Sequence, residues 1–154
     1  MMRIFDARTI RAPAESVFEV AQAVERWPEF LPHYRWVRVR ETRSDCRIVE
    51  MAAWRPFGLF NYPTWWVSEM WVDQPALQVR YHHIDGITRG MSVIWSVEAS
   101  GSETRASIVH EWRGPAWPLI CRPAAEWVIG PVFIHAIASR TLEGIARRVE
   151  HRAI

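Results

Sequence analysis

The sequence contains no lysine, and all 19 basic residues among its 154 are arginine. Without lysine, the chain cannot form a Schiff base with a carbonyl substrate. It also cannot supply the lysine that contacts nucleotide phosphates in a P-loop. The absence therefore excludes two large classes of enzyme before any motif is considered.

The chain also has few cysteines and a small net charge. The two cysteines, Cys46 and Cys121, do not have the spacing of a metal site or a redox pair, so we expect a cytoplasmic protein. We expect no transmembrane helix, because no apolar run reaches about 18 residues. The N-terminus lacks the apolar region of a signal peptide. A net charge of +2 is too small to indicate nucleic acid by itself.

Motifs for metal binding and for serine catalysis are absent from the sequence. Of the six histidines, His82 and His83 are adjacent on an expected strand, so their side chains must diverge. There is no HxH, HExxH or paired-cysteine spacing and no GxSxG motif. We therefore expect no metal and no organic cofactor.

Tryptophan, in contrast, is abundant, with ten residues in the chain. Each indole ring is bulky and needs a partner for its N–H group. The surplus indicates either a highly aromatic core or a cavity lined by aromatic rings, and the sequence leaves both open. Trp65 and Trp66 are neighbours on an expected strand, so at most one of them faces an interior cavity.

The end of the chain carries the clearest periodicity. Apolar residues recur there every three or four positions, and charged residues occupy most of the other side. This pattern predicts an amphipathic helix that runs to Arg152 and either begins at Pro131 or kinks there after an earlier turn from Pro123. At about 1.5 Å per residue it spans about 33 Å and needs a broad apolar surface to pack against. The apolar positions are Ile134, Ile137, Ala138, Thr141, Leu142, Ile145 and Val149.

The rest of the chain reads mainly as strands. A first helix that closes at Trp27-Pro28 and a short helical turn from Glu29 to Leu31 follow the opening strand. Asp85-Gly86 is a strong hairpin signal, and an apolar loop is expected from Pro56 to Pro63. The expected strands are Met2–Arg11, Tyr34–Thr42, Arg47–Arg55, Trp65–Val72, Leu77–His83, Thr88–Ala99 and Arg105–Trp112.

This order of elements predicts an α+β fold in which residues 1–154 form a single domain. Consecutive hairpins make the seven-stranded sheet antiparallel. One long helix is available to cover one face of that sheet. If the sheet curls around the helix, a cavity opens between them.

The chain also resembles a known family over nearly its whole length. The residues that carry the resemblance are Ile10-x-Ala12-Pro13-Ala14-x-x-Val17-Phe18, Val24-Glu25-x-Trp27-Pro28-x-Phe30-Leu31-Pro32, Ile94-Trp95-Ser96-Val97, Gly101, Thr104-Arg105 and the closing helix. They are similar to the polyketide cyclase/dehydrase and coenzyme Q-binding branch of the START-like (Bet v 1-like, SRPBCC) superfamily. The resemblance implies a helix-grip fold, in which a curved sheet wraps the C-terminal helix around a hydrophobic ligand cavity. The segment from Gly114 to Arg122 departs from the pattern through its proline and tryptophan content, so the cavity mouth is expected to differ.

His110 is the strongest candidate for chemistry. It interrupts an apolar strand face between Ile108 and Trp112, where an imidazole can act as acid or base. A histidine there can equally be a core residue that hydrogen-bonds a neighbour. Tyr81 and His83 share an inward face on a nearby strand. A tyrosine–histidine pair could polarise a ketone, take a proton from an acidic carbon, or hold the head group of a quinone or lipid.

We therefore take His110 and Tyr81 as candidate catalytic residues. Two segments, Phe57–Pro63 and Pro115–Ile120, are candidates for an entrance lid, although simple loop packing explains them as well. Val37 and Val39 are expected to point inward from the second strand. The candidate ligand-binding residues are Trp66, Met70, Val79, His83, Met91, Val93, Trp95, Ile108, Trp112, Ile134, Ile137 and Thr141.

The preferred hypothesis is a protein that binds a hydrophobic small molecule and cyclises or dehydrates a polyketide-like chain. The resemblance also allows a non-catalytic quinone or lipid carrier, or a ribosome-associating module that uses an arginine-rich strand edge. That edge carries enough acid that a solvated surface is the simpler interpretation, so we expect no nucleic-acid partner. A homodimer is left open. The arginines concerned are Arg35, Arg38, Arg40, Arg43 and Arg47.

Overall fold

The computed structural model describes residues 2–57, 60–113 and 131–152. Its strands form a seven-stranded sheet with the order β1-β7-β6-β5-β4-β3-β2, and every neighbouring pair is antiparallel. The predicted fold class is confirmed. The elements are β1 (Met2–Ile10), α1 (Ala14–Gln22), the 3-10 helix η1 (Val24–Glu29), β2 (Tyr34–Thr42), β3 (Arg47–Phe57), β4 (Phe60–Asp73), β5 (Gln78–Gly86), β6 (Ser92–Ser100), β7 (Glu103–Trp112) and α3 (Pro131–Arg152).

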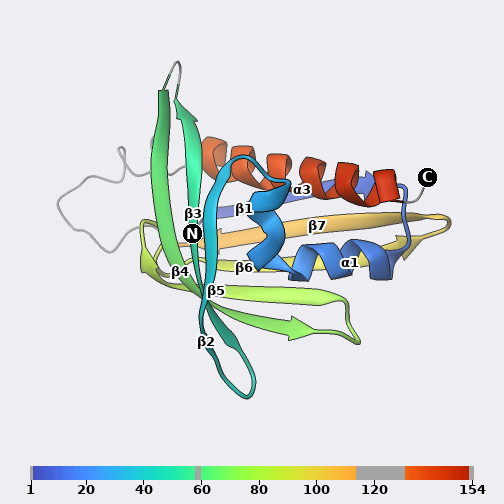
Figure 1. The fold of residues 1–154 in the computed structure, drawn as a ribbon, viewed down its shortest axis with the longest axis horizontal. Coiled ribbons are helices and arrows are strands. Elements are labelled where there is room, and N and C mark those ends of the chain that lie inside the picture. The colour runs from blue at the N-terminus through green and yellow to red at the C-terminus, as the bar shows by residue number, and fades with distance from the viewer. Residues whose placement is uncertain (1, 58–59, 114–130, 153–154) are drawn as a thin grey trace.

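The sheet bends strongly along its length. In Figure 1, β3 and β4 rise steeply, whereas β6 and β7 run across the molecule beneath the long helix α3. Helix α3 packs against β1, β3 and β7, and α1 packs against α3, β6 and β7. Both helices therefore occupy the concave side of the sheet, which is the helix-grip arrangement.

Helix α3 begins at Pro131, one of the two starts that the sequence allowed. Its buried side chains follow the predicted three- and four-residue spacing, and Ile145 has no solvent-exposed surface. Full burial of an aliphatic side chain contributes about 1.5–3 kcal/mol each. The helix is therefore held mainly by its apolar face. The buried positions are Ile134, Ala138, Thr141, Leu142, Ile145, Ala146 and Val149.

The connection between β5 and β6 differs from the prediction. Strand β5 continues through Gly86, the chain turns at residues 87–90, and β6 begins only at Ser92. Gly86 is not the tip of a hairpin, because it pairs with Trp66 across the β4–β5 ladder. Its positive φ of 92° and its contact with β4 explain the glycine better than a two-residue turn does.

The predicted loop from Pro56 to Pro63 is wrong for most of its length. Residues 56, 57 and 60–63 belong to β3 and β4, with Trp54 opposite Pro63 and Pro56 opposite Asn61. At this end β3 has passed its last partner on β2, and β4 has not yet reached β5. A proline is tolerated there because its missing N–H faces no second strand.

Two smaller predictions also need correction. Val39 pairs with Val49 in step with the Val37–Met51 pair and so lies on the same face as the buried Val37, but it is 37% exposed rather than part of the interior. The first helix ends at Gln22, and a separate 3-10 helix then carries Trp27 into the core. The indole Nε1 of Trp27 donates to the Val20 carbonyl at 3.2 Å, which ties η1 back onto α1.

No helix among the described residues is long and apolar enough to cross a membrane. Cys46 is buried with a free thiol, and Cys121 lies outside the described residues.

Gly86→Ala is predicted to destabilise the fold by more than about 3 kcal/mol. A Cβ at this position would lie 2.3 Å from the Trp65 carbonyl oxygen and 2.5 Å from the Trp66 Cα, and both are backbone atoms that cannot move aside. The free energy of unfolding from urea titrations measures the effect. Gly101→Ala is the matched control, because Gly101 also has a positive φ but no atom within 4 Å of a new Cβ. Equal losses in the two variants would contradict the prediction.

Candidate functional site

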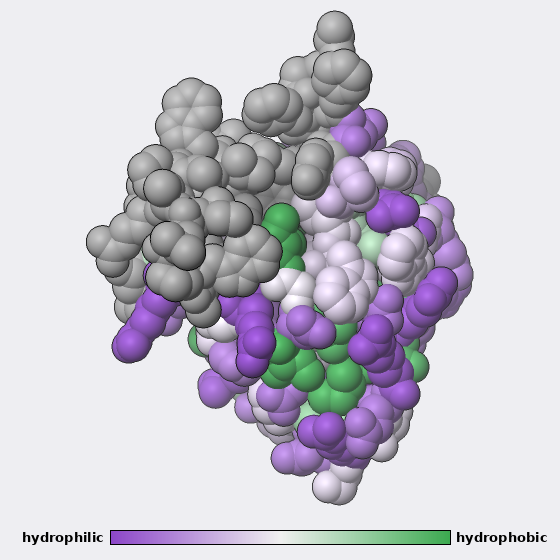
Figure 2. Space-filling model, turned by 90° about the vertical axis from the view of Figure 1, so that its left-hand side faces the viewer, coloured by the Kyte–Doolittle hydropathy of each residue, from purple (hydrophilic) through white to green (hydrophobic). Residues whose placement is uncertain are grey.

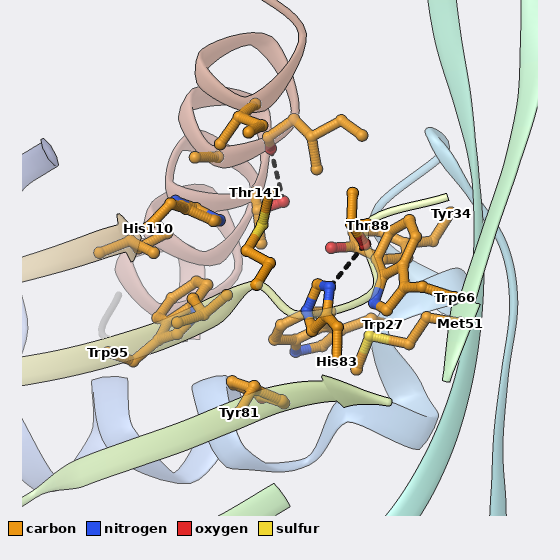
Figure 3. Close-up of a pocket in the computed structure, with 16 residues that line it drawn as sticks. Trp27, Tyr34, Met51, Trp66, Tyr81, His83, Thr88, Trp95, His110 and Thr141 are labelled. Carbon is orange, nitrogen blue, oxygen red and sulfur yellow. Dashed lines mark hydrogen bonds between the residues drawn. The ribbon is translucent and has the colours of Figure 1, made fainter. Parts of the chain in front are cut away.

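A narrow cavity lies between the concave face of the sheet and α3 (Figure 3). Its volume is about 60 Å³, and most of its wall is apolar or aromatic. Strands β5, β6 and β7 form the floor, α3 forms the roof, and Trp27 of η1 closes one side. The lining residues are Trp27, Tyr34, Met51, Trp66, Tyr81, His83, Thr88, Met91, Val93, Trp95, Ile108, His110, Ile134, Ile137, Ala138 and Thr141.

His110 and Tyr81 lie on the same transverse row of the sheet. His110 of β7 pairs with Val93 of β6, which in turn pairs with Tyr81 of β5. Cross-strand partners point to the same face, and neighbouring strands are about 4.8 Å apart. The two side chains therefore leave the sheet on the same side, with backbones about 10 Å apart. A ring above Val93 would lie between them.

The two candidate residues share a second property. The Tyr81 hydroxyl and the His110 Nδ1 are buried, and neither has a hydrogen-bond partner among the described residues. Buried polar atoms in folded proteins are nearly always paired, because an unpaired group costs about 1–3 kcal/mol. Asp6 Oδ2 is the third such atom, but Asp6 is absent from the described cavity lining, and its Oδ1 contacts His135 at the seam between β1 and α3. Among the described residues, two of these three unpaired atoms thus belong to side chains that line the cavity.

His83 is already occupied, in contrast to His110. Its Nδ1 lies 2.6 Å from the Thr88 hydroxyl, and its ring stacks on Trp66 with centroids 5.8 Å apart (Figure 3). Burial, and to a smaller extent the nearby His110, lower the pKa of His83 to about 3. His83 is therefore a neutral, fixed part of the wall.

The cavity environment sets the protonation of its titratable groups. Burial lowers the pKa of His110 to about 4, so the imidazole is neutral at pH 7. Burial raises the pKa of the Tyr81 hydroxyl well above its usual range, so it remains a hydrogen-bond donor. Neutral imidazole has one nitrogen that can accept a proton. The row therefore presents a base at one end and an acid at the other.

Most of the predicted site residues line this cavity, but three do not. Met70, Val79 and Trp112 are buried in the core outside the lining. Met70 lies one strand beyond Tyr81 and contacts the Arg47 guanidinium at 3.5 Å. The Trp112 indole instead donates to the Arg89 carbonyl at 3.0 Å. The predicted residues that line the cavity are Tyr81, His110, Trp66, His83, Met91, Val93, Trp95, Ile108, Ile134, Ile137 and Thr141.

The sequence analysis did not identify the whole wall. Ala138 was recognised only as part of the helix stripe, and its spacing from Ile134 could have placed it beside the cavity. Thr88 was expected on a strand, whereas the turn places it against His83. Trp27, Tyr34 and Met51 come from η1, β2 and β3, and only the curvature of the sheet brings them to the cavity.

Much of the predicted entrance lid lies outside the described residues. The segment Pro115–Ile120 and residues 58–59 lie outside the described residues. Figure 2 shows that, on the face seen from the left-hand side of Figure 1, apolar side chains gather within a border of hydrophilic ones.

The described cavity is smaller than the roughly 150 Å³ that accommodates benzene in an engineered core. A larger ligand therefore requires wall side chains to move, and Met51 and Met91 are unbranched and adaptable.

The arginine-rich edge is largely satisfied by its own neighbours. Arg40 donates to Glu50 at 2.6 Å, and the indole of Trp65 donates to the same carboxylate at 2.9 Å. The Arg35 guanidinium lies between Trp36 and Trp54, 4.7 and 4.6 Å from their ring centroids. These contacts hold the arginines flat on the outer surface of the sheet.

No cluster of His, Cys, Asp or Glu within residues 2–57, 60–113 and 131–152 has the arrangement of a metal site.

Comparison with known proteins places these features in a family. The profile of the family described as polyketide cyclase/dehydrase and lipid transport matches residues 10–138. A protein of Streptomyces cyaneus, named as a polyketide cyclase, is 30% identical over 105 residues, which are 63% of this chain and 63% of the relative's own length. The chain thus spans less than two thirds of that relative.

Solved structures show the same fold. The Zhui aromatase/cyclase from Streptomyces sp. R1128 superposes with a TM-score of 0.84 at 18% identity and covers 99% of this chain and 96% of its own. A START superfamily protein from Mycobacterium smegmatis gives a TM-score of 0.75 at 10% identity, with 97% of each chain covered. At such identities the likeness establishes the START-like fold alone.

Acid is predicted to destabilise the folded protein below pH 6.5. Burial lowers the pKa of His33 and of His110 to about 4 and that of His83 to about 3, whereas unfolded histidine titrates near 6.5. The unfolded chain therefore binds more protons between these values, and the free energy of unfolding falls as pH falls. For His110 the loss at pH 5 is on the order of 1–2 kcal/mol.

Urea unfolding at pH 7.5 and pH 5 measures this difference. His110→Leu should reduce the dependence on pH, and His82→Leu, which alters an exposed histidine on the same sheet, should not. A wild-type stability that is the same at both pH values would refute the burial of neutral imidazoles.

Proposed function

Because this chain belongs to the polyketide cyclase/dehydrase and lipid transport family, we propose that its cavity binds a hydrophobic, polyketide-like chain and catalyses cyclisation followed by dehydration. The proposal goes beyond family membership, because it assigns the chemistry to named residues. His110 is proposed as the base and Tyr81 as the acid.

One observation carries this proposal. Tyr81 and His110 line the same apolar cavity on one row of the sheet, and neither the Tyr81 hydroxyl nor the His110 Nδ1 has a partner among the described residues. A ligand carbonyl or hydroxyl group at each end of the row would satisfy both. The apolar wall between them suits the carbon skeleton that joins those groups.

The proposed reaction needs only proton transfers. His110 accepts a proton from a carbon next to one carbonyl group, and the resulting enolate attacks a second carbonyl carbon of the same chain. A carbon–carbon bond forms while Tyr81 donates its proton to the new alkoxide. The Tyr81 phenolate then takes another α-proton, and His110 returns its proton to the hydroxyl group, which leaves as water and gives a carbon–carbon double bond; both residues regain their starting protonation. No electrons are gained or lost overall, so no redox partner is required.

The proposal ties activity to the pKa of His110. With the histidine pKa lowered to about 4, kcat/KM should rise as pH increases through that value and then remain level between pH 6 and pH 9. The burial that raises the pKa of Tyr81 keeps the hydroxyl protonated over that range.

Cyclisation can be tested with heptane-2,6-dione, a linear diketone whose ring closure and loss of water give 3-methylcyclohex-2-enone. The wild-type protein should accelerate formation of this absorbing enone, and His110→Leu should lose about 100-fold or more of the rate, as expected for removal of a general base. His82→Leu is the matched control, because His82 is exposed and lies outside the cavity lining.

Binding is measured separately with 2-naphthol and naphthalene, which differ by one hydroxyl group. We expect 2-naphthol to bind about tenfold more tightly, and His110→Leu to remove most of that difference. Selective binding of 2-naphthol without enone formation would favour a carrier of quinones or lipids over an enzyme. Equal binding of both compounds would contradict the proposed role of Tyr81 and His110 in binding polar groups of the ligand.

A further inference from the structure

A second hollow lies outside the cavity, between the outer side of α3 and the chain that joins η1 to β2. It has a volume of about 630 Å³, within the range of roughly 300–1,000 Å³ typical of ligand sites. Phe30, Leu31 and Pro32 form one wall, and Trp54 of β3 extends it. We call this hollow the outer groove.

The floor of the outer groove depends on a glycine. A Cβ at Gly144 would lie only 2.1 Å from Leu31 Cδ2, so Leu31 packs directly against the helix at this point. Leu31 is only 1% exposed. Because the helix lacks a side chain here, the residues on either side of Gly144 project as the rims of a depression.

The helical side of the outer groove is positively charged. Arg140, Arg147 and Arg148 line it together with one carboxylate, Glu143. Glu143 pairs with Arg147 four residues later, and the Arg148 guanidinium lies 5.2 Å from the ring centroid of Phe30. No carboxylate among the described residues pairs with Arg140. The groove therefore combines an apolar wall with a surplus of guanidinium groups.

His33 forms the boundary between this groove and the inner cavity. Its Nε2 lies 2.9 Å from the hydroxyl of Thr141, and Thr141 lines the inner cavity while His33 lines the groove. Burial lowers the pKa of His33, and the positive charge of Arg140 lowers it further, which places that charge close to the ring. An anion beside Arg140 would be sensed by the His33 imidazole.

We propose that the outer groove is a second binding site for an amphipathic organic anion, with its phosphate or carboxylate at Arg140 and Arg148 and its apolar part against Phe30 and Trp54. Guanidinium groups suit both oxyanions, because their N–H donors form paired, charge-assisted hydrogen bonds. The site is separate from the cavity row and requires neither Tyr81 nor His110.

Calorimetric titration with octyl phosphate, octanoate and 1-octanol tests this assignment. At least one of the two anions should bind about tenfold or more tightly than the alcohol, and Arg140→Gln should weaken that anion by about tenfold. Arg8→Gln, which removes the same charge from an exposed position on β1, should change nothing. Tighter binding of octyl phosphate assigns a phosphate ester, and tighter binding of octanoate assigns a carboxylate; equal affinities support the shared anionic class.

An NMR measurement locates the bound anion. The ring signal of His33 should shift on addition of the tighter anion, whereas the signal of the exposed His82 should not. Two results would overturn the assignment. One is equal binding by the Arg140→Gln and Arg8→Gln variants, and the other is 1-octanol binding as tightly as both anions. Neither result bears on cyclisation, which is measured through His110.

Discussion

The packing of α3 into the concave side of the sheet is the constraint on which the other features depend. Helix α3, with α1 beside it, covers a sheet whose far strands, β3 and β4, bend toward α3, and Ile145 and Leu142 anchor the contact with almost no exposure. A flat sheet would leave no enclosed space beside α3, whereas a sheet closed tightly on α3 would leave no room for a cavity. The bend brings Tyr34 and Met51 to the same cavity as His110. Sheet curvature thus sets the shape of the interior, and aromatic side chains form part of the cavity wall.

Within that interior, two polar atoms remain unpaired. The protein could have paired Tyr81 or His110 with a neighbour, as it does His83 with Thr88 and His33 with Thr141. Leaving them unpaired costs stability, and proteins commonly accept such a cost at sites that act on a ligand. Of four buried or half-buried side chains in one small region, His83 and His33 have partners, whereas the Tyr81 hydroxyl and the His110 Nδ1 do not. This contrast is the physical basis for the proposed chemistry.

The sequence predicted the fold well because its signals are local. The helical spacing from Ile134 to Val149 and the alternation on β5, β6 and β7 each involve neighbouring residues, and the structure bears them out. Predictions failed where a distant strand decides the outcome. Gly86 looked like a turn residue but contacts β4, and the prolines of β3 and β4 are accommodated because a further strand is missing beside them. Trp27 and Met51 reach the cavity only through curvature, which no local pattern encodes.

The free energy of unfolding of Tyr81→Phe, measured without ligand, tests most directly whether the Tyr81 hydroxyl lacks a hydrogen-bond partner in the folded protein. Removal of a buried hydroxyl that has a partner normally costs about 1 kcal/mol or more, because the partner is left unsatisfied. If the Tyr81 hydroxyl has no partner, the variant should be as stable as the wild-type protein or more stable. A loss of about 1 kcal/mol or more would show that the hydroxyl is already paired, and the proposed ligand contact would then be contradicted.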